Sequence, residues 1–480
     1  MKSAISHKIL LLLILSLLFS NCASEMEVIP EEIEINDFVW KGLNAYYFWQ
    51  SSKPDLADTR FNSQATLNNY VSGFSTPEGI FESLLLRPTD RFSWIVDDYT
   101  VLENAFQGVT LNNGMEFGLV RYKTTTSNVF GYVRYVIPGS DAATKGIVRG
   151  MIFNQINGVQ ITDTNYSSLL NNNSYTIGLA DFNDGDPTST ATTIPLIKSQ
   201  LEENPVKITK VFDEVMGNKI GYLMYNQFST SFDAELNTAF LTFKNENITD
   251  LIIDLRYNVG GSVRTATYLG TMITGQFNEQ VFSKQVWNEK VLASVTPDYF
   301  TNRFPNQINN GMITENINSV HLPRIYFIVS GSSASASELV INSLRSYIDV
   351  KLVGTRTVGK QEGSITLYDA DDLRKNGPNF NTNHRYALQP IVLEITNKDN
   401  QNEIDGFLPG VTLPGIELGE DYGNLGVLGE RSDPLVDRTI NYILTGNRGS
   451  FSSQKKEYSV EIYNSKLATP TGSNMYFELK

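Results

Sequence analysis

The chain has 480 residues, of which 41% are hydrophobic and 19% charged, a composition typical of folded globular proteins and too apolar for a disordered chain. This length exceeds what one hydrophobic core usually organises, so we expect two or three domains. The formal net charge of −14 is spread along the chain. Nucleic-acid binding, which needs clustered Lys and Arg, is therefore excluded as a function class.

The N-terminus predicts export. Two lysines precede an apolar run over residues 9–19, which is typical of a signal peptide and too short to span a bilayer. We expect residues 1–21 to be this signal peptide and residues 22–34 to be a linker. Cys22, the only cysteine, stands at the expected cleavage point. The arrangement resembles a bacterial lipoprotein signal and implies a lipid on Cys22; the alternative is a lone cysteine in an ordinary signal peptide.

Three regions with different patterns follow. Aromatic residues at three- and four-residue spacing begin a small, mainly helical domain over residues 35–105. Short β-type runs separated by Gly and Asn-Gly predict a β-rich domain over residues 106–200, with a polar, exposed loop at 181–193. Strands alternate with helical patterns over residues 205–445, which predicts α/β layering. Residues 446–480 form a polar C-terminal extension to which the sequence assigns no structure.

A serine-rich segment follows the apolar strand predicted at residues 325–329. It places Ser335 where a strand passes into a helix. Unpaired backbone N–H groups and the helix dipole favour a developing negative charge at such a turn. Ser335 is therefore a candidate nucleophile, and the alternative is a serine-rich helix N-cap.

Lys360 follows a glycine just after another predicted buried strand. Serine is a poor nucleophile and needs a base. A lysine serves as that base only when its pKa falls from about 10.4 to roughly 7–8, which costs about 4 kcal/mol. Burial or a cationic neighbour must supply this energy; the alternative is an ordinary surface lysine.

A third signal is the run Asn258-Val259-Gly260-Gly261, which follows the predicted strand 251–255. The missing Cβ atoms let backbone N–H groups approach a ligand oxygen. One such donor to a developing oxyanion is worth roughly 10²–10³ in rate. Taken alone, the run predicts only a tight turn.

The histidines and possible metal ligands give little support for a catalytic triad or a metal site. His7 lies in the predicted signal peptide, and neither His321 nor His384 has a recognisable catalytic context. A Ser-His-Asp triad is therefore thinly supported. No residue spacing matches a zinc or calcium site, so we expect neither a metal nor another cofactor.

Together the three signals resemble the C-terminal processing, or tail-specific, serine peptidases. That family's pattern is a strand ending Asp-Leu-Arg-x-Asn-x-Gly-Gly, then Ser-Ala-Ser-Glu, then Gly-Lys; here Lys360 follows Ser335 by 25 residues. The resemblance implies Ser335 as nucleophile, Lys360 as general base, and the backbone N–H groups of Gly260 and Ala336 as oxyanion donors. It also implies a multidomain α/β fold with a crotonase/Clp-protease-like catalytic core over residues 205–445.

The β-rich region is similar to the PDZ-like module that the family carries before its core. The run from Glu116 to Val120 looks like the loop that holds a peptide's C-terminal carboxylate while the peptide adds a strand to the sheet. The resemblance implies that Phe117, Gly118 and Leu119 bind that carboxylate. The expected partners are protein or peptide substrates, bound through their C-termini by an exported protein anchored in the bacterial cell envelope, periplasmic or surface-facing.

One position departs from the family pattern. Many members place a Gln four residues after the lysine to orient it, and this chain has Ser364 there. A hydroxyl also accepts a hydrogen bond, but with shorter reach. Ser364, Gln361, Glu362 and Glu338 therefore all remain candidates for the third catalytic group.

Two other functions stay open. The first is a catalytically inactive peptide-binding lipoprotein with a PDZ-like receptor domain, which the change at Ser364 motivates. The second is a Ser-His hydrolase acting on a lipid or ester. It requires His321 or His384 beside Ser335.

Overall fold

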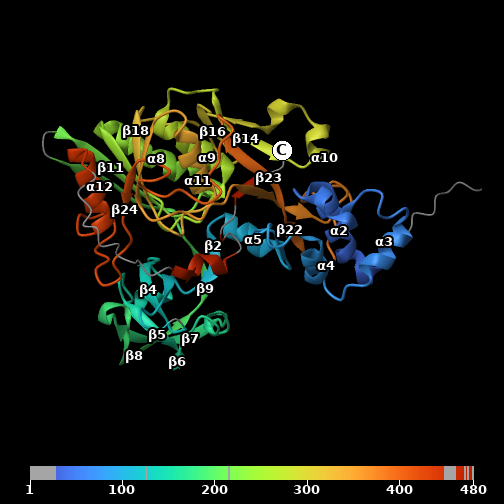
Figure 1. Cartoon of the computed structure of the whole chain (residues 1–480), viewed down its shortest axis with the longest axis horizontal. Coiled ribbons are helices and arrows are strands. Elements are labelled where there is room, and N and C mark those ends of the chain that lie inside the picture. The colour runs from blue at the N-terminus through green and yellow to red at the C-terminus, as the bar shows by residue number, and fades with distance from the viewer. Residues whose placement is uncertain are drawn as a thin grey trace, which may run out of the picture.

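The computed structural model describes residues 29–125, 127–214, 217–447, 461–469, 472 and 475–477. The predicted signal peptide, Cys22 and most of the predicted linker lie outside these residues. Figure 1 shows a helical lobe on the right, a β-rich lobe at the bottom and an α/β lobe at the upper left. Within the described part of the chain, no helix is long and apolar enough to cross a membrane.

The helical lobe forms because short amphipathic helices bury aromatic and aliphatic side chains against one another. Phe38, Val39 and Leu43 of its first long helix are fully buried. Thr76 caps a later helix that packs against the first. The elements are η1 (Glu31–Ile33), α2 (Glu34–Tyr46), η2 (Gln50–Ser52), η3 (Pro54–Leu56), α3 (Gln64–Val71), α4 (Pro77–Leu84), β1 (Trp94–Val96) and α5 (Tyr99–Phe106).

The β-rich lobe has a hydrophobic core of its own, which includes Phe117, Leu119 and Phe153. Its main sheet runs in the order β25-β3-β4-β5-β7-β8, with β6 beside β5, and β2 pairs separately with β9. The loop predicted at residues 181–193 is wrong from Thr188 onward, because β8 begins there. The elements are β2 (Val109–Asn112), β3 (Met115–Arg121), β4 (Val129–Val136), α6 (Asp141–Thr144), β5 (Ile152–Ile156), β6 (Val159–Gln160), α7 (Tyr166–Leu170), β7 (Ser174–Asp181), η4 (Asn183–Gly185), β8 (Thr188–Ile197), β9 (Ser199–Glu202) and β25 (Glu461–Asn464).

The α/β lobe is built on a sheet in the order β10-β11-β12-β18-β19-β24, in which every pair after β10-β11 is parallel. Alternate residues of β12 and β18 face the helices α8, α9 and α11 on one side and α12 on the other. Burial on both faces explains why these strands are nearly continuous apolar runs. The elements are β10 (Val206–Asp213), β11 (Lys219–Tyr225), η6 (Thr230–Phe232), α8 (Asp233–Glu246), β12 (Asp250–Asp254), α9 (Val263–Thr274), β18 (Arg324–Val329), α11 (Ala336–Leu344), β19 (Asp349–Gly354), β24 (Gly415–Glu417) and α12 (Pro434–Thr445).

A second sheet packs beside these helices in the order β13-β26-β20-β23-β14-β15. Its strand β26 comes from the C-terminal segment, and so does β25 of the β-rich lobe. The region that the sequence left unassigned therefore contributes strands to two sheets. The remaining elements are β13 (Gly261–Ser262), β14 (Val281–Trp287), α10 (Glu289–Ser294), η7 (Pro297–Phe300), β15 (Thr301–Arg303), β16 (Gln307–Asn309), β17 (Thr314–Asn316), β20 (Glu362–Ile365), β21 (Leu367–Tyr368), β22 (Ala387–Gln389), β23 (Ile391–Asn397), η8 (Ser465–Ala468) and β26 (Met475–Phe477).

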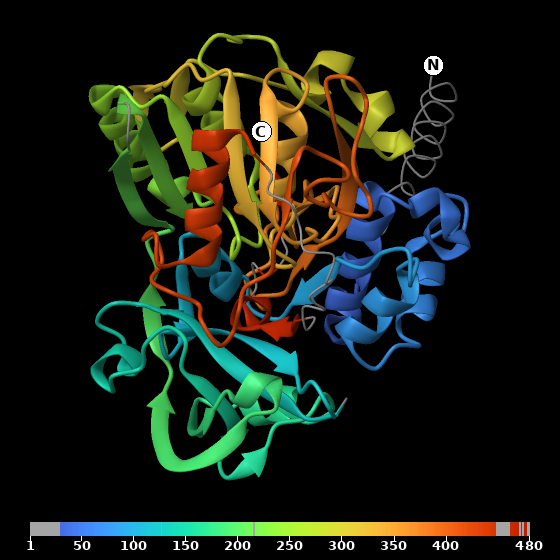
Figure 2. The same ribbon diagram turned by 60° about the vertical axis from the view of Figure 1, so that its left-hand side comes forward.

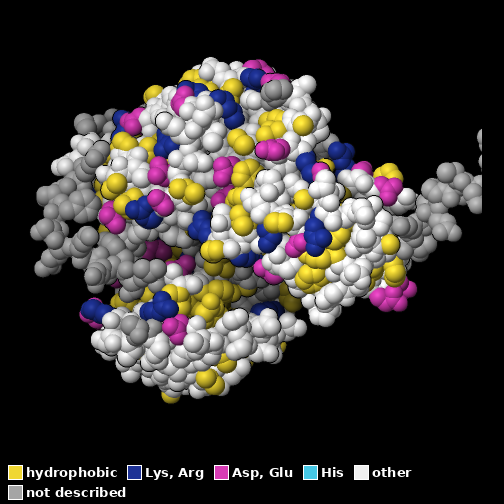
Figure 3. All heavy atoms as spheres, turned by 45° about the vertical axis from the view of Figure 1, so that its right-hand side comes forward, with side chains coloured by type: hydrophobic (Ala, Val, Ile, Leu, Met, Phe, Trp, Pro, Cys, Tyr) yellow, Lys and Arg dark blue, Asp and Glu magenta, His cyan; other side chains and the backbone are white. Residues whose placement is uncertain are grey.

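The lobes meet around the carboxyl ends of the parallel strands. The loops that follow β12, β18 and β19 leave the sheet at this edge, where open α/β sheets place their sites. Figure 2 shows the last strands of the chain, in red, at the junction of the three lobes. Figure 3 shows the β-rich lobe meeting the rest of the surface along a hollowed boundary where hydrophobic side chains gather.

Candidate active site

Ser335 occupies the turn between β18 and α11. Its backbone has φ 65° and ψ −118°, a left-handed conformation that non-glycine residues rarely adopt and that concentrates at functional sites. The residue is completely buried, and its Oγ has no hydrogen-bond partner among the described residues. The turn therefore holds a hydroxyl in a strained position that no structural hydrogen bond explains.

Lys360 lies in the loop between β19 and β20 and is only 1% exposed. Burial lowers the pKa of its ammonium from 10.5 to about 7, against the charges of Glu362 and Asp90, which act in the opposite direction. The Nζ atom lies 4.5 Å from the centroid of the Phe92 ring, in the loop between α4 and β1. The helical lobe thus helps to remove this lysine from solvent.

Glu338 joins the loops that carry these two residues. Its Oε2 accepts the backbone N–H groups of Ser335 and Lys360, each at 2.9 Å. Its Oε1 accepts the N–H of Gly359 at 2.7 Å and the hydroxyl of Thr357. One carboxylate oxygen thus accepts the backbone N–H groups of both predicted catalytic residues. Because each backbone nitrogen lies 2.9 Å from this oxygen, the two nitrogens lie close together. Glu338 holds the main chain of both loops in place.

The other three candidates for the third group lie differently, and the carboxylate of Glu362 accepts the backbone N–H of Gln361 at 3.1 Å. The hydroxyl of Ser364 donates to Oε1 of Gln389 at 2.8 Å. The side chain of Gln361 donates to the carbonyl of Glu403 at 3.2 Å, so it turns toward the loop after β23. Gln389 is fully buried on β22, so the hydroxyl of Ser364 is held by an amide from another strand. No local sequence signal indicates it.

The glycine loop after β12 is bound tightly to the nucleophile turn. The carbonyl of Asn258 accepts the N–H of Ala334 at 3.2 Å and the hydroxyl of Ser337 at 3.1 Å. A Cβ on Gly261, which has φ +135°, would lie 2.1 Å from the carbonyl oxygen of Phe228. Only glycine fits at that position, because the backbone of Phe228 approaches it closely.

The two predicted oxyanion donors are in different states. The N–H of Gly260 donates to Oδ1 of Asn258 at 2.9 Å. Ala336 is the first residue of α11, where a backbone N–H has no partner within the helix. In this structure Gly260 is therefore engaged within its own loop, while Ala336 remains available by helix geometry.

The two histidines of the described residues lie beside other elements, and the ring of His321 is next to Gly275 at the end of α9. Nε2 of His384 lies 2.9 Å from a carboxylate oxygen of Asp369, and Nδ1 accepts the N–H of Tyr386 at 3.1 Å. Both ring nitrogens are thus used in the loop before β22. Among the described residues, no group of His, Cys, Asp and Glu side chains is arranged to hold a metal ion.

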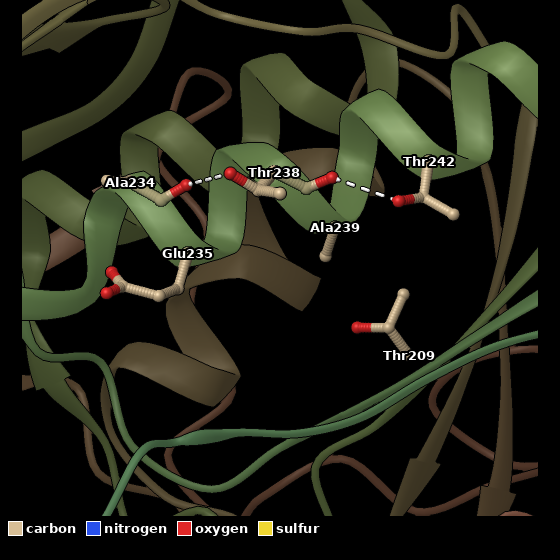
Figure 4. Close-up of a pocket in the computed structure, with 6 residues that line it drawn as sticks. All are labelled: Thr209, Ala234, Glu235, Thr238, Ala239 and Thr242. Carbon is tan, nitrogen blue, oxygen red and sulfur yellow. Dashed lines mark hydrogen bonds between the residues drawn. The ribbon is translucent and has the colours of Figure 1, made fainter.

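A pocket of ≈350 Å³ lies elsewhere, between α8 and β10 (Figure 4). Thr238 donates to the carbonyl of Ala234 at 2.9 Å, and Thr242 donates to that of Thr238 at 3.3 Å. These hydroxyls are satisfied within the helix, and none of the predicted catalytic residues lines the pocket. It is therefore not a candidate active site.

Comparison with known proteins gives two family matches. Residues 219–374, which include Ser335 and Lys360, match the model of peptidase family S41. Residues 34–94, which include Phe92, match the peptidase S41 N-terminal domain.

Relatives with known names agree with these matches. The chain is 25% identical over 271 residues to the chloroplastic carboxyl-terminal-processing peptidase 3 of Arabidopsis thaliana, covering 54% of this chain and 47% of that protein. It is 24% identical over 316 residues to the carboxy-terminal-processing protease of Bartonella bacilliformis, covering 59% of this chain and 65% of that protein. The chain thus spans less than two thirds of the length of these relatives.

A solved structure shares the fold. A Bacteroides fragilis protein, assigned to the S41 proteases, superimposes with a TM-score of 0.62 at 22% identity, over 85% of this chain and 97% of that one. The mixed α/β, multidomain architecture expected from the sequence is confirmed. The chain thus matches peptidase family S41 over residues 34–94 and 219–374, and it is similar to the carboxyl-terminal processing peptidases.

Proposed function

We propose that the protein is a serine endopeptidase that uses a Ser335-Lys360 dyad. The observation that carries the proposal is the buried lysine, whose pKa of about 7 suits a general base at neutral pH. Its backbone shares one carboxylate oxygen of Glu338 with the backbone of the strained Ser335. A structural lysine has no need of this combination.

The reaction follows from these positions. The neutral amine of Lys360 takes the proton of the Ser335 hydroxyl as Oγ attacks the peptide carbonyl carbon, and the resulting ammonium returns that proton to the leaving amine. The N–H of Ala336 stabilises the oxyanion, joined by Gly260 once it leaves Asn258. Water then hydrolyses the acyl-enzyme, with Lys360 again as the base.

Three groups position the base without taking part in the proton transfer. Glu338 fixes the backbone of the loop that carries Lys360, and the ring of Phe92 covers the Lys360 ammonium. Ser364 is held by Gln389 and lies on β20, the strand that begins just after Lys360. Of the three, we expect Glu338 to contribute most to positioning Lys360, because it alone also binds the turn that carries Ser335.

We assign the β-rich lobe, residues 106–200, as a PDZ-like module, and residues 205–445 as a crotonase/Clp-protease-like core behind a helical domain at 35–105. Support for a peptide-binding role comes from the edge of β3, where an extended segment pairs as an added strand. The proposed substrates are exported proteins or peptides of the cell envelope. The lipid proposed on Cys22 would keep the enzyme at the membrane surface.

The pH dependence of peptide hydrolysis tests the proposed base. We expect kcat/KM for an unstructured protein such as casein to rise about tenfold per pH unit below about pH 7 and to level off above it, because only the neutral amine accepts the proton. Initial rates of fluorescent casein cleavage over this range measure the profile. A rate that does not change between about pH 6 and 9 would remove Lys360 from the mechanism.

A catalytically inactive peptide-binding protein is the second candidate. One observation favours it: the N–H of Gly260, needed for the oxyanion, donates to Asn258 in this structure. A Ser-His hydrolase is disfavoured, because both nitrogens of His384 are engaged in the loop before β22 and the ring of His321 lies beside Gly275 at the end of α9.

A further inference from the structure

The C-terminal segment, defined here as residues 461–469 and 475–477, lies on two strand edges that a peptide substrate would need. β25 pairs with the edge of β3 in the β-rich lobe, and β26 lies between β13 and β20 beside the catalytic loops. We propose that this segment is an intramolecular pseudosubstrate, which competes with an incoming peptide strand for both edges. The name pseudosubstrate rests on the proposed peptidase function, but the competition does not.

The first edge is the one predicted to bind a peptide carboxylate. β25 runs antiparallel to β3, with Tyr463 opposite Leu119 and Asn464 opposite Gly118. The N–H of Phe117 donates to the hydroxyl of Ser465 at 2.9 Å. All three residues predicted to hold a carboxylate thus face the protein's own chain, as they would face an added peptide strand.

The chain passes through this site and does not end in it. Glu116, a buried carboxylate, accepts the hydroxyl of Ser465 at 2.6 Å. Its pKa is raised by burial and by the neighbouring charge of Glu203. A free C-terminal carboxylate at the position of Ser465 would add a further negative charge there, whereas a neutral hydroxyl does not. The site is therefore better suited to an internal segment than to a chain end.

A buried ionic contact anchors β25. Glu461 forms an ion pair with Arg134 of β4, which is 1% exposed, and accepts the hydroxyl of Tyr132 at 2.7 Å. The hydroxyl of Ser332 donates to Glu461 at 3.1 Å and accepts a hydrogen bond from Arg134 at 2.7 Å. Ser332 belongs to the turn that carries Ser335. The occupied edge of the β-rich lobe is thus in direct contact with the nucleophile turn.

Tyr463, two residues after Glu461, indicates a second requirement for a segment that pairs with β3. The Tyr463 ring lies 5.0 Å from that of Tyr166 and 6.4 Å from that of Phe117, measured between centroids. The edge of β3 therefore selects an extended segment with an acidic side chain and, two residues later, an aromatic one. This is the chemistry expected of a peptide that displaces the segment.

The second edge lies between the loop that carries Gly260 and the loop that carries Lys360. β26 runs parallel to β13, with Met475 opposite Gly261, and parallel to β20, with Tyr476 opposite Ser364. The carbonyl of Met475 lies 3.2 Å from the hydroxyl of Ser364. β13 begins directly after Gly260 and β20 two residues after Lys360, so this slot is where an extended substrate would reach the dyad.

The positions of the two strands suit displacement. β25 is the outermost strand of its sheet, so its departure breaks no other strand pair. β26 is held by two residue pairs on each side. A pocket of ≈680 Å³, lined in part by Tyr476 and Phe477, lies at its end. A competing strand therefore has room to continue beyond the slot.

Peptide binding to the full chain tests the competition. The probe is a fluorescent peptide with the sequence of residues 461–468, and the protein carries Ser335→Ala so that nothing is cleaved. We expect Glu461→Ala to raise the affinity for this peptide roughly ten- to hundredfold, because the strand in cis loses a charge-assisted hydrogen bond that the peptide in trans restores with Arg134. Fluorescence anisotropy measures the affinity.

Two further variants make the result decisive. Leu467→Ala, in the same segment but with a side chain 43% exposed, serves as the matched control and should leave the affinity unchanged. Glu461→Gln preserves the size of the side chain and should give a smaller increase, which separates displacement from misfolding. Equal peptide affinity in the Glu461→Ala, Glu461→Gln and Leu467→Ala chains would overturn the proposal.

Casein hydrolysis by the same variants with Ser335 intact separates the two proposals. A rise in both peptide affinity and hydrolysis with Glu461→Ala supports both. A gain in affinity without hydrolysis in any chain keeps the competition and removes the peptidase function. Normal hydrolysis with unchanged affinity removes the competition and keeps the peptidase function.

Discussion

Ser335→Ala and Lys360→Met should each abolish hydrolysis of an unstructured protein, lowering kcat/KM by roughly 10⁴-fold or more. The first change removes the attacking oxygen, and the second removes the only proposed acceptor for its proton. Because the two residues act as one unit, the double variant should be no slower than either single variant. Cleavage of fluorescent casein measures all three rates.

Matched controls are available in the same region. Ser343 lies in α11, and its buried hydroxyl also has no hydrogen-bond partner among the described residues; Ser343→Ala should retain full activity. Lys398→Ala removes a partly exposed lysine at the end of β23 and should do the same. Hydrolysis undiminished in Ser335→Ala or Lys360→Met would rule out the assigned dyad.

The same lysine variant should be more stable than the wild type. Lys360 has a pKa of about 7 when folded and 10.5 as its ordinary value. Between these values the unfolded chain binds a proton that the folded chain does not, so the stability of the wild type rises with pH across this window. The cost of burial, about 5 kcal/mol, is fully present below about pH 7 and is lost by about pH 10.5. Urea unfolding should therefore show a gain for Lys360→Met that shrinks as the pH rises.

Glu338→Ala should reduce both activity and stability. Ser335, Gly359 and Lys360 would each lose the acceptor of a buried N–H group, and Thr357 that of its hydroxyl. An unsatisfied buried donor costs about 1–3 kcal/mol, so we expect a loss of roughly 3–5 kcal/mol on urea unfolding. Because the two loops would no longer be held together, kcat/KM should fall about 10²-fold.

Glu338→Gln distinguishes positioning from general destabilisation. The charge of Glu338 raises the pKa of Lys360, so removing it should lower that pKa and move the pH profile of kcat/KM toward acid. Glu246→Gln, at the end of α8 where its carboxylate pairs with Lys219, is the control and should leave the profile in place. A folded Glu338→Ala chain with wild-type activity would show that this carboxylate positions nothing.

The parts of the fold that the sequence predicted have local causes. The strands at 251–255 and 325–329 read as apolar runs because both of their faces are covered by helices. The glycine at 261 belongs to the predicted tight turn, and the structure adds that any side chain there would collide with Phe228. By contrast, β8 was predicted as a loop at residues 188–193, because its Thr- and Ser-rich sequence faces solvent at the sheet edge and obtains its partner only from β7.

The C-terminal strands could not be predicted for a similar reason. β25 and β26 have four and three residues, too few for a periodic pattern. Each forms only because another strand offers an edge. Arg134, the buried partner of Glu461, lies 327 residues away along the chain, and no local feature of either residue indicates the other.

The residues of the candidate site could be proposed from the sequence, but their environment could not. The spacing of Ser335 and Lys360 pointed to the dyad, and Glu338 was one of several candidates for a third group. The pKa of Lys360 depends on burial beneath the loop that carries Phe92, which belongs to a different lobe. Gln389 reaches Ser364 from another strand of the fold.

Covalent labelling shows whether Ser335 is the nucleophile. The wild-type and Glu461→Ala chains are treated with a fluorophosphonate, and intact mass and peptide mapping locate the adduct. We expect one adduct, on Ser335, that is absent from Ser335→Ala and forms much more slowly in Lys360→Met, because only an activated serine attacks the reagent. Casein cleavage by a wild-type chain that carries no adduct at Ser335 would contradict it.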